Sequence, residues 1–332
     1  MTPYLVAFAS FLLVYFAVET NSGHRSASPG ERLALLLPLA IFAVLYAGQI
    51  GTDVESYGGL FEIAEDYPLE PGFSILMIGA KSIGLNYVAF TKVLALVQMM
   101  LLAYVVLRLR DPLFFLLFYL SAFFLNFQFN AIRNSFALLI IAALYVRAQR
   151  PGATALVGAT VIHYSSVLTL GLQRLATSKR QWLAIGLVAG IALAFAAIWL
   201  HPEIGGDRLG DLFVYKGYLE QDYESKSFYP ALLLKLVVAW FFLRNGGRPF
   251  YFRTYAILVV LVHLVSPILS RLCDLVLFLA LLDVCARQRL QHYRGLAIGL
   301  TLVLVVSSLL IPWNDCQHGG EDRWCLVGGS AR

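Results

Sequence analysis

The chain has 332 residues, of which 59% are hydrophobic and 14% are charged, and its mean hydropathy is +0.74. A soluble domain of this length could not bury so much apolar surface, so the composition excludes a soluble globular protein. The formal net charge of +5 is ordinary for an inner-membrane protein and does not indicate binding to nucleic acid.

Apolar runs follow one another along the chain, and several approach the roughly 20 residues that a helix needs to cross a bilayer. They are residues 33–50, 88–107, 112–127, 182–200 and 296–312. An earlier run, residues 3–18, lacks the basic start and the small-residue cleavage site of a signal peptide, so we expect a retained helix there. The sequence predicts an all-α, polytopic transmembrane bundle that forms one integral membrane domain over residues 1–332.

The charges orient this bundle, because cytoplasmic loops of membrane proteins are enriched in Lys and Arg. More than half of the 25 Lys and Arg residues fall in six clusters, which we expect on the inside. The clusters are Arg25 with Arg32, Arg108 with Arg110, Arg147 with Arg150, Arg174 with Lys179 and Arg180, Arg244 with Arg248 and Arg253, and Arg287 with Arg289 and Arg294. Residues 51–72 contain several acids but no Lys or Arg, and are expected outside.

These constraints give about ten crossings, with both termini outside and outer segments at residues 51–87, 201–228 and 313–332. Within the first outer segment, residues 71–84 are expected to form an interfacial helix, since a further crossing would move Arg108 outside. Residues 152–175 have basic residues at both ends, which predicts two re-entrant half-helices with His163 near the break. Broken helices at membrane depth are tolerated where they line a cavity or are buried in protein.

The four cysteines fall in two places. Cys273 and Cys285 lie in one predicted helix and are expected to be free, buried thiols. Cys316 and Cys325 lie in the predicted outer C-terminal tail. The sequence is compatible both with a disulfide between them and with two unpaired thiols.

Polar side chains that are costly near hydrocarbon gather in the outer half of this topology, which is typical of a functional site. The candidate site residues are Asp53, Tyr57, Glu70, Asn130, Arg133, His163, Tyr164, Ser165 and Arg271. No spacing of histidine and cysteine indicates a metal site.

Each of these side chains also has an ordinary interpretation. Arg133 could extend to lipid headgroups, and Arg271 could pair with Asp274 one helical turn away. His163 with its neighbouring serines could satisfy a helix break, while Asp53 and Tyr57 could belong to a solvated loop and an aromatic belt. Three further polar residues are interpreted as packing or cavity groups: Lys92, Gln98 and Lys235.

Five short motifs, in order, resemble those of the EpsG family of bacterial exopolysaccharide and O-antigen polymerases of the Wzy type. They are Asp53-x-x-x-Tyr57, Glu70-Pro71-Gly72-Phe73, Asn130-Ala131-Ile132-Arg133-Asn134-Ser135-Phe136-Ala137, His163-Tyr164-Ser165-Ser166, and Arg271. The resemblance covers residues 50–285. The sequence departs from the family at Asn134, where relatives often carry glutamine, and at Cys273-Asp274, where relatives tend to have aromatic residues.

The resemblance implies a glycosyltransferase of the GT-C type in a bacterial inner membrane, with its active site facing the periplasm. Such an enzyme transfers a glycan from an undecaprenyl pyrophosphate donor to a lipid-linked repeat unit, and needs no cofactor and no nucleic acid. Its partners would be the lipid-linked oligosaccharide, the bilayer and a chain-length regulator. Two alternatives stay open: a GT-C enzyme that transfers a single sugar from a polyprenyl phosphate, with Asp53 and Glu55 as its acidic pair, and a transporter or flippase of lipid-linked oligosaccharides.

Glycosyl transfer needs a base for the acceptor hydroxyl and fixed positive charge for the leaving pyrophosphate. We expect Arg133 and Arg271 to bind the pyrophosphate, since guanidinium groups bind phosphate oxygens through two hydrogen bonds. Asp53 is the preferred base and His163 the second candidate. The remaining candidates are expected to orient the substrate: Tyr57, Glu70, Asn130, Tyr164 and Ser165.

Overall fold

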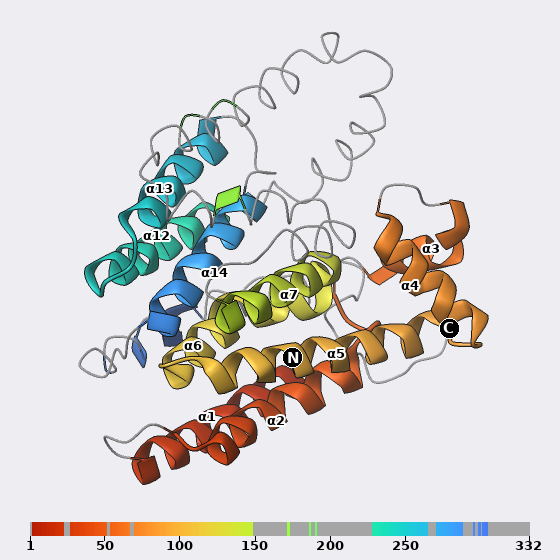
Figure 1. Cartoon of the computed structure of the whole chain (residues 1–332), viewed down its shortest axis with the longest axis horizontal. Coiled ribbons are helices and arrows are strands. Elements are labelled where there is room, and N and C mark those ends of the chain that lie inside the picture. The colour runs from red at the N-terminus through yellow and green to blue at the C-terminus, as the bar shows by residue number, and fades with distance from the viewer. Residues whose placement is uncertain are drawn as a thin grey trace. The chain divides into compact units, whose positions relative to one another are not determined.

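The computed structural model describes residues 2–22, 27–51, 54–66, 70–148, 228–264 and 270–287, together with 171–172, 186, 190, 295, 298–299 and 301–304. Helices and the turns between them make up this part of the chain, and it contains no strand (Figure 1). The chain divides into two compact units, residues 1–170 with 285–332 and residues 171–284.

The described part of the first unit contains seven α-helices and three short helical segments. Its helices are α1 (Thr2–Ser22), α2 (Pro29–Tyr46), α3 (Val54–Glu62), α4 (Pro71–Ser82), α5 (Tyr87–Arg108), α6 (Pro112–Tyr119) and α7 (Ile132–Ala148). The short segments are the 3₁₀-helix η1 (Ala64–Asp66) and the π-helical η2 (Leu120–Phe124) and η3 (Asn126–Asn130).

Polar caps mark where several of these helices begin. Ser28 and Glu31 form a reciprocal capping box at the start of α2, and Pro29 occupies the first turn, where a missing N–H costs nothing. Asn86 accepts a 2.9 Å hydrogen bond from Ala89 N at the start of α5, and Asp111 caps α6 through Phe114 N at 3.1 Å. These caps fix the boundaries of the apolar helices.

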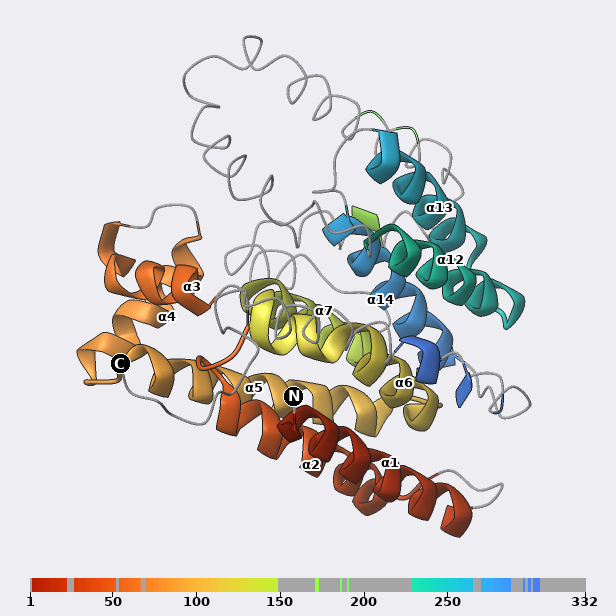
Figure 2. The same cartoon turned by 180° about the vertical axis from the view of Figure 1, so that it is seen from behind.

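Helix α5 is the central element of the first unit. Helices α2 and α7 both pack against it, and α1 packs against α2 (Figures 1 and 2). At 22 residues α5 is about 33 Å long, close to the thickness of a bilayer core. Helices α3 and α4 lie at its N-terminal end in both views.

The opposite end of α5 carries basic side chains. Arg32 donates hydrogen bonds from Nη1 to the carbonyl oxygens of Val106 (3.2 Å), Leu107 (3.0 Å) and Leu109 (3.2 Å), where the helix leaves its last carbonyls unpaired. The exposed Arg108 guanidinium lies 3.6 Å from the centroid of the Tyr104 ring. The two ends of α5 therefore differ in charge, with Arg32 and Arg108 at the C-terminal end.

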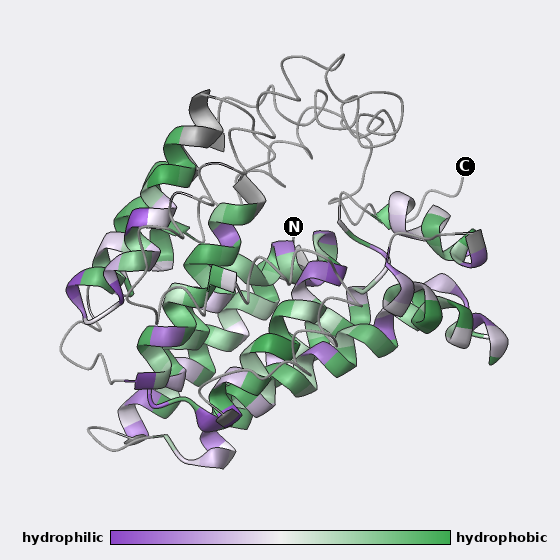
Figure 3. Ribbon diagram, turned by 45° about the horizontal axis from the view of Figure 1, so that its top comes forward, coloured by the Kyte–Doolittle hydropathy of each residue, from purple (hydrophilic) through white to green (hydrophobic). Residues whose placement is uncertain are grey.

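Apolar side chains remain exposed along the helices. Helix α2 buries Leu35, Leu39 and Phe42 but exposes Leu33, Leu37, Ile41 and Leu45, which recur every fourth residue on one face. A continuous exposed apolar stripe of this kind is unfavourable in water and suits contact with lipid. Figure 3 shows hydrophobic colour along the middle of the helices and hydrophilic colour towards their ends.

The second unit contains α12 (Phe228–Arg244), α13 (Pro249–Leu264) and most of α14 (Ser270–Arg287). A tight turn joins α12 to α13: Gly246 has φ +83°, and Gly247 N donates a 2.7 Å hydrogen bond to Phe242 O. Arg248, at this turn, donates from Nε to both carboxylate oxygens of the buried Asp283 at 3.2 and 3.3 Å. This ion pair fastens the turn to α14.

The all-α prediction is confirmed for the residues that the structure describes. By length and composition, α2 and α5 could cross a membrane, and shorter apolar stretches occupy Leu5–Asn21, Pro112–Phe124 and Pro249–Val260. The total of about ten crossings, the GT-C likeness and the interfacial position of residues 71–84, which form α4 and its C-terminal turn, stay predictions.

Other predictions concern segments that the structure covers little or not at all. The re-entrant segment 152–175, apart from residues 171–172, and the outer segments 201–228 and 313–332, apart from residue 228, lie outside the described residues, as do Cys316 and Cys325. Cys273 and Cys285 are both free and buried in α14, as predicted.

Candidate active site

Two of the described site residues form an ion pair that joins the start of α4 to α7. Arg133 Nη1 lies 2.5 Å from Glu70 Oε2. The Glu70 side chain is 1% exposed and the Arg133 side chain 14% exposed. A buried carboxylate requires a charged or hydrogen-bonding partner, and the guanidinium supplies both.

The ion pair also compensates for an unfavourable position of Arg133. This residue is the second of α7, and a cation there is repelled by the positive end of the helix dipole. Glu70 compensates for this charge.

Glu70 makes this contact from an unusual position. It is the residue immediately before α4, where a side-chain oxygen ordinarily accepts a hydrogen bond from the first turn of the helix. Here no such capping bond forms, and Pro71 begins the helix with no N–H to satisfy. The carboxylate is directed to Arg133 instead, so the start of α4 serves the ion pair rather than its own helix.

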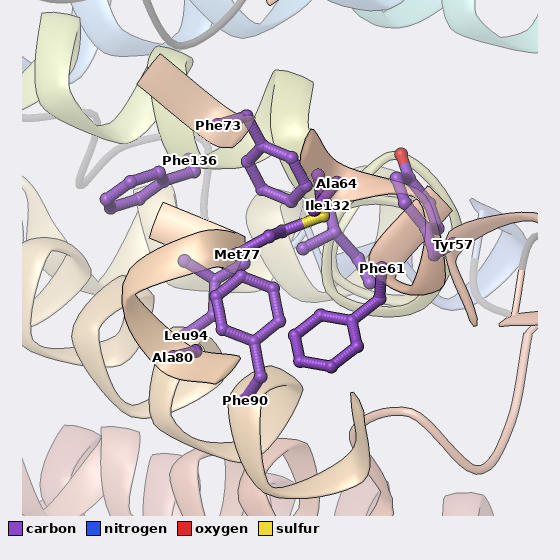
Figure 4. Packing of buried hydrophobic residues seen from close by; sticks show 10 residues of the cluster. All are labelled: Tyr57, Phe61, Ala64, Phe73, Met77, Ala80, Phe90, Leu94, Ile132 and Phe136. Atoms are coloured by element: carbon purple, nitrogen blue, oxygen red, sulfur yellow. The ribbon is translucent and has the colours of Figure 1, made fainter. Parts of the chain in front are cut away.

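Two aromatic rings lie beside the guanidinium. The Arg133 Cζ atom is 5.2 Å from the centroid of the Tyr57 ring and 5.9 Å from that of Phe73. Both distances are within the range of cation–π attraction. The two ring centroids are 6.5 Å apart, and both rings belong to the cluster that packs α3 and α4 against α5 and α7 (Figure 4).

This cluster explains how the aromatic side chains are held. It consists of Tyr57, Phe61, Ala64, Phe73, Met77, Ala80, Phe90, Leu94, Ile132 and Phe136 (Figure 4). Lys81 adds a polar link, because its ammonium group donates a 2.9 Å hydrogen bond to the Glu62 carbonyl at the end of α3. The apolar core and this link fix α3 and α4 at the end of α5, and thereby fix Tyr57 and Glu70.

The start of α7 is positioned by a change of helix type. The chain runs through two π-helical segments and breaks at Ala131, whose N–H bonds to Asn126 O at 2.7 Å, before α7 begins. π-Helical turns occur often at functional sites. From α5, the buried Gln98 donates a 2.9 Å hydrogen bond from Nε2 to Ile132 O, next to Arg133.

Asn130 lies at this break, against the segment that follows α2. A Cβ atom built at Gly51 would come 2.9 Å from Asn130 Oδ1 and closer still to the Phe129 carbonyl oxygen. Gly51 also has φ +121°, a conformation that other residues rarely adopt. Glycine therefore permits a close approach between Asn130 and the chain two residues before Asp53.

The structure brings together only part of the predicted site. Tyr57, Glu70 and Arg133 are in contact, and Asn130 lies at the nearby helix break. Four of the predicted residues lie outside the described part of the chain: Asp53, His163, Tyr164 and Ser165. Arg271 is the second residue of α14 in the second unit, and its side chain also lies outside that part.

Sequence reasoning missed the structural contacts of three described residues. Phe73 received no role although it follows Glu70 closely in the same motif. Gln98 was interpreted as a packing group, yet it positions the start of α7. Lys235, interpreted in the same way, forms a 2.6 Å ion pair with Asp274, which had been considered as a partner for Arg271. The signal in both polar cases is a side chain with hydrogen-bonding capacity in the interior of an apolar helix.

The site has the groups needed to bind an anion and a sugar, since guanidinium binds phosphate and aromatic faces pack on apolar sugar surfaces. Among the described residues no group of three or more His, Cys, Asp or Glu side chains could hold a metal ion. Asp53 is not among those residues, so the prediction that no metal is needed stays a prediction.

The described part of the chain is helical and has exposed apolar stripes, with a charged and aromatic cluster at one helix end, which is typical of the class of helical membrane proteins. Its sequence matches the EpsG family over residues 32–314, and the chain belongs to that family. No curated protein and no solved structure gives a match. Membership indicates a glycosyltransferase-like polysaccharide polymerase, with a lipid-linked glycan as the general class of substrate.

Proposed function

We propose that the protein polymerises lipid-linked glycan repeat units at the periplasmic face of a bacterial inner membrane. The donor is a glycan on undecaprenyl pyrophosphate, and the acceptor is a second lipid-linked repeat unit. The single observation that carries this proposal is the Arg133 guanidinium, held by the buried Glu70 carboxylate against two aromatic rings at one end of the bundle. The family membership supports the reaction class.

The proposed reaction is a displacement at the anomeric carbon of the donor sugar. The acceptor hydroxyl oxygen forms the new bond to this carbon while the bond from the carbon to the pyrophosphate oxygen breaks. The pyrophosphate leaves with the bonding electron pair, and the hydroxyl proton passes to a base, for which Asp53 is the first candidate and His163 the second. Each step is balanced without an oxidant, a reductant or a nucleotide.

Arg133 stabilises the departing charge in this scheme. Its guanidinium stays protonated and presents several donors in a plane, so it can keep Glu70 on one nitrogen and offer other donors to phosphate oxygens. Low hydration at the buried ion pair strengthens such contacts, and one well-placed donor is worth about 3 kcal/mol of transition-state stabilisation. Arg271 is proposed as the second pyrophosphate ligand.

Tyr57 and Asn130 are proposed to orient the substrate, together with Tyr164 and Ser165. The Tyr57 ring, already packed beside Arg133, offers a face for sugar and a hydroxyl for hydrogen bonding. Glu70 is proposed to act mainly through Arg133, because its side chain is almost fully buried in the ion pair.

The outward orientation rests on the charge distribution. Residues 51–72 contain no Lys or Arg, and α3, which forms from this region, lies together with α4 at the N-terminal end of α5. Arg32 and Arg108 lie at the other end. The rule that basic residues remain in the cytoplasm then supports a periplasmic site.

A reconstitution experiment separates this proposal from its rivals. Purified protein in liposomes is supplied with undecaprenyl pyrophosphate-linked repeat units, and both chain length and the sidedness of the lipid are measured. A polymerase yields ladders spaced by whole repeat units without net translocation. Transfer of single sugars from a polyprenyl phosphate would indicate the single-sugar transferase, and translocation without elongation would indicate a flippase.

A further inference from the structure

Another pair of opposite charges lies inside the second unit, away from the C-terminal end of α12. Lys235 Nζ is 2.6 Å from Asp274 Oδ1, and the two side chains are 18% and 14% exposed. Lys235 precedes the end of α12, at Arg244, by about two and a half turns, or about 14 Å. Asp274 lies on α14, about one turn from its first residue.

A different ion pair also joins these helices. Arg248 and Asp283 connect α14 to the turn between α12 and α13. An ion pair inside an apolar helix bundle gains little net stability, because removing both charges from water offsets their attraction. Ionisable residues in membrane helices are correspondingly associated with binding and transport of polar groups.

Lys235 also has bonding capacity that its one observed contact does not use. An ammonium group has three N–H donors, and one of them is directed to Asp274. No other polar partner of Lys235 occurs among the residues that the structure describes. The side chain keeps some exposure, so an acceptor from outside the chain can reach it.

The register of α14 relates this pair to the proposed pyrophosphate ligand. Arg271 precedes Asp274 by three residues, the spacing that puts two positions on one side of a helix. The Lys235–Asp274 pair and the position of the proposed pyrophosphate ligand therefore belong to the same N-terminal part of α14.

We infer that Lys235, held in place by Asp274, forms a phosphate-binding site for the headgroup of a polyprenyl pyrophosphate lipid. This inference rests on the proposed function and deepens it by adding a lipid-phosphate ligand in the second unit. Lys235 is the residue that contacts the phosphate, and Asp274 is a positioning residue. A phospholipid headgroup has the same phosphate chemistry, so the experiment must distinguish the two.

The test is ligand binding to the purified full chain in detergent, measured by native mass spectrometry. The probes are undecaprenyl pyrophosphate, undecaprenol and phosphatidylglycerol. We expect Lys235→Met to weaken undecaprenyl pyrophosphate binding by about tenfold or more, because a charge-assisted hydrogen bond is lost. Lys235→Arg should retain most of the binding, and undecaprenol should bind the wild type and Lys235→Met equally.

Exchanging the two charged residues of the pair distinguishes a site that binds lipid from an ion pair that only stabilises the fold. The double variant Lys235→Asp with Asp274→Lys restores an ion pair but moves the ammonium group, so we expect it to fold without regaining lipid binding. The matched control is the exchange of Arg248 and Asp283, which should leave binding near the wild-type level. Recovery of binding by the Lys235 and Asp274 exchange would show that the pair is structural and overturn the inference.

A second measurement needs no variant. Undecaprenyl pyrophosphate should protect Lys235 of the wild type from an amine-specific reagent, while phosphatidylglycerol should not. Equal protection by phosphatidylglycerol would assign the site to a phospholipid and overturn the polyprenyl assignment. Absence of protection by either lipid would overturn it as well.

Failure of this inference can be distinguished from failure of the polymerase proposal. If the wild type elongates glycans and Lys235→Met binds the lipid and elongates normally, only this inference fails. If the wild type binds the lipid through Lys235 but never elongates, only the polymerase proposal fails.

Discussion

The carboxylate of Glu70 lies in the N-cap position of α4 but pairs with Arg133 in α7, 2.5 Å away, instead of capping its own helix. The pair connects positions separated by 63 residues in the chain. The pair therefore connects the residue just before α4 to the first turn of α7. It also holds in place the Arg133 guanidinium, which is the cation that the proposed chemistry requires.

The Glu70–Arg133 pair should show strong thermodynamic coupling. Glu70→Gln removes the buried partner charge and should lower the free energy of unfolding by about 3 kcal/mol, because an uncompensated buried cation remains. Arg133→Gln alone should have a similar effect, and the double variant should cost clearly less than the sum of the two. Chemical unfolding in mixed micelles measures this cycle. Additive effects would mean that the pair does not form in the membrane.

Tyr57 should act through its ring. Tyr57→Phe keeps the face beside Arg133, so stability should be nearly unchanged, and Tyr57→Leu should cost about 1 kcal/mol of cation–π attraction in addition to packing. Elongation assays and thermal unfolding check both variants. Phe136→Leu serves as a control from the same cluster, since it should destabilise the protein without selective loss of elongation. Equal losses of elongation in Tyr57→Leu and Phe136→Leu would assign Tyr57 to packing alone.

Gly51 and Gly59 offer a matched pair of glycine substitutions. Gly51→Ala forces a side chain into a positive-φ conformation and against the Phe129 carbonyl, and should cost about 1–3 kcal/mol and disturb Asn130. Gly59 lies within α3, and a Cβ atom there meets nothing within 4 Å, so Gly59→Ala should be neutral or stabilise by up to about 1 kcal/mol. Thermal unfolding and glycan elongation of both variants provide the comparison. A tolerated Gly51→Ala would contradict the close approach.

The orientation of the bundle can be tested by labelling single cysteines. In a background with the four native cysteines replaced by serine, Gly59→Cys should react with a membrane-impermeant thiol reagent added to the periplasmic side. Arg108→Cys, exposed at the other end of α5, should react only after the cytoplasmic side is opened. The reverse pattern would invert the proposed topology.

The helical fold could be predicted from sequence because apolar runs, polar caps and basic clusters act locally. The pairing of Glu70 with Arg133 could not, since it depends on how α3 and α4 fold back over the end of α5. The π-helical turns before Ala131 were not predicted either, because an apolar run does not distinguish i→i+5 from i→i+4 hydrogen bonding.

The second unit illustrates the same limit. Helical spacing suggested Arg271 as a partner of Asp274, which stays a prediction because that side chain lies outside the described residues, whereas the Lys235–Asp274 pair comes from another helix. Local spacing identifies which residues share a face of a helix, but it does not identify the neighbouring helix. Partners such as Gln98 for Ile132 therefore become evident only in three dimensions.

Glycan elongation by purified variants tests most directly whether Arg133 stabilises a departing pyrophosphate. Arg133→Ala should reduce the elongation rate by at least about a hundredfold with lipid-linked repeats, and Arg133→Lys should restore only a small part. Arg108→Ala, which removes an exposed arginine from the opposite end of α5, should elongate at the wild-type rate. Normal ladders from well-folded Arg133→Ala would contradict the account.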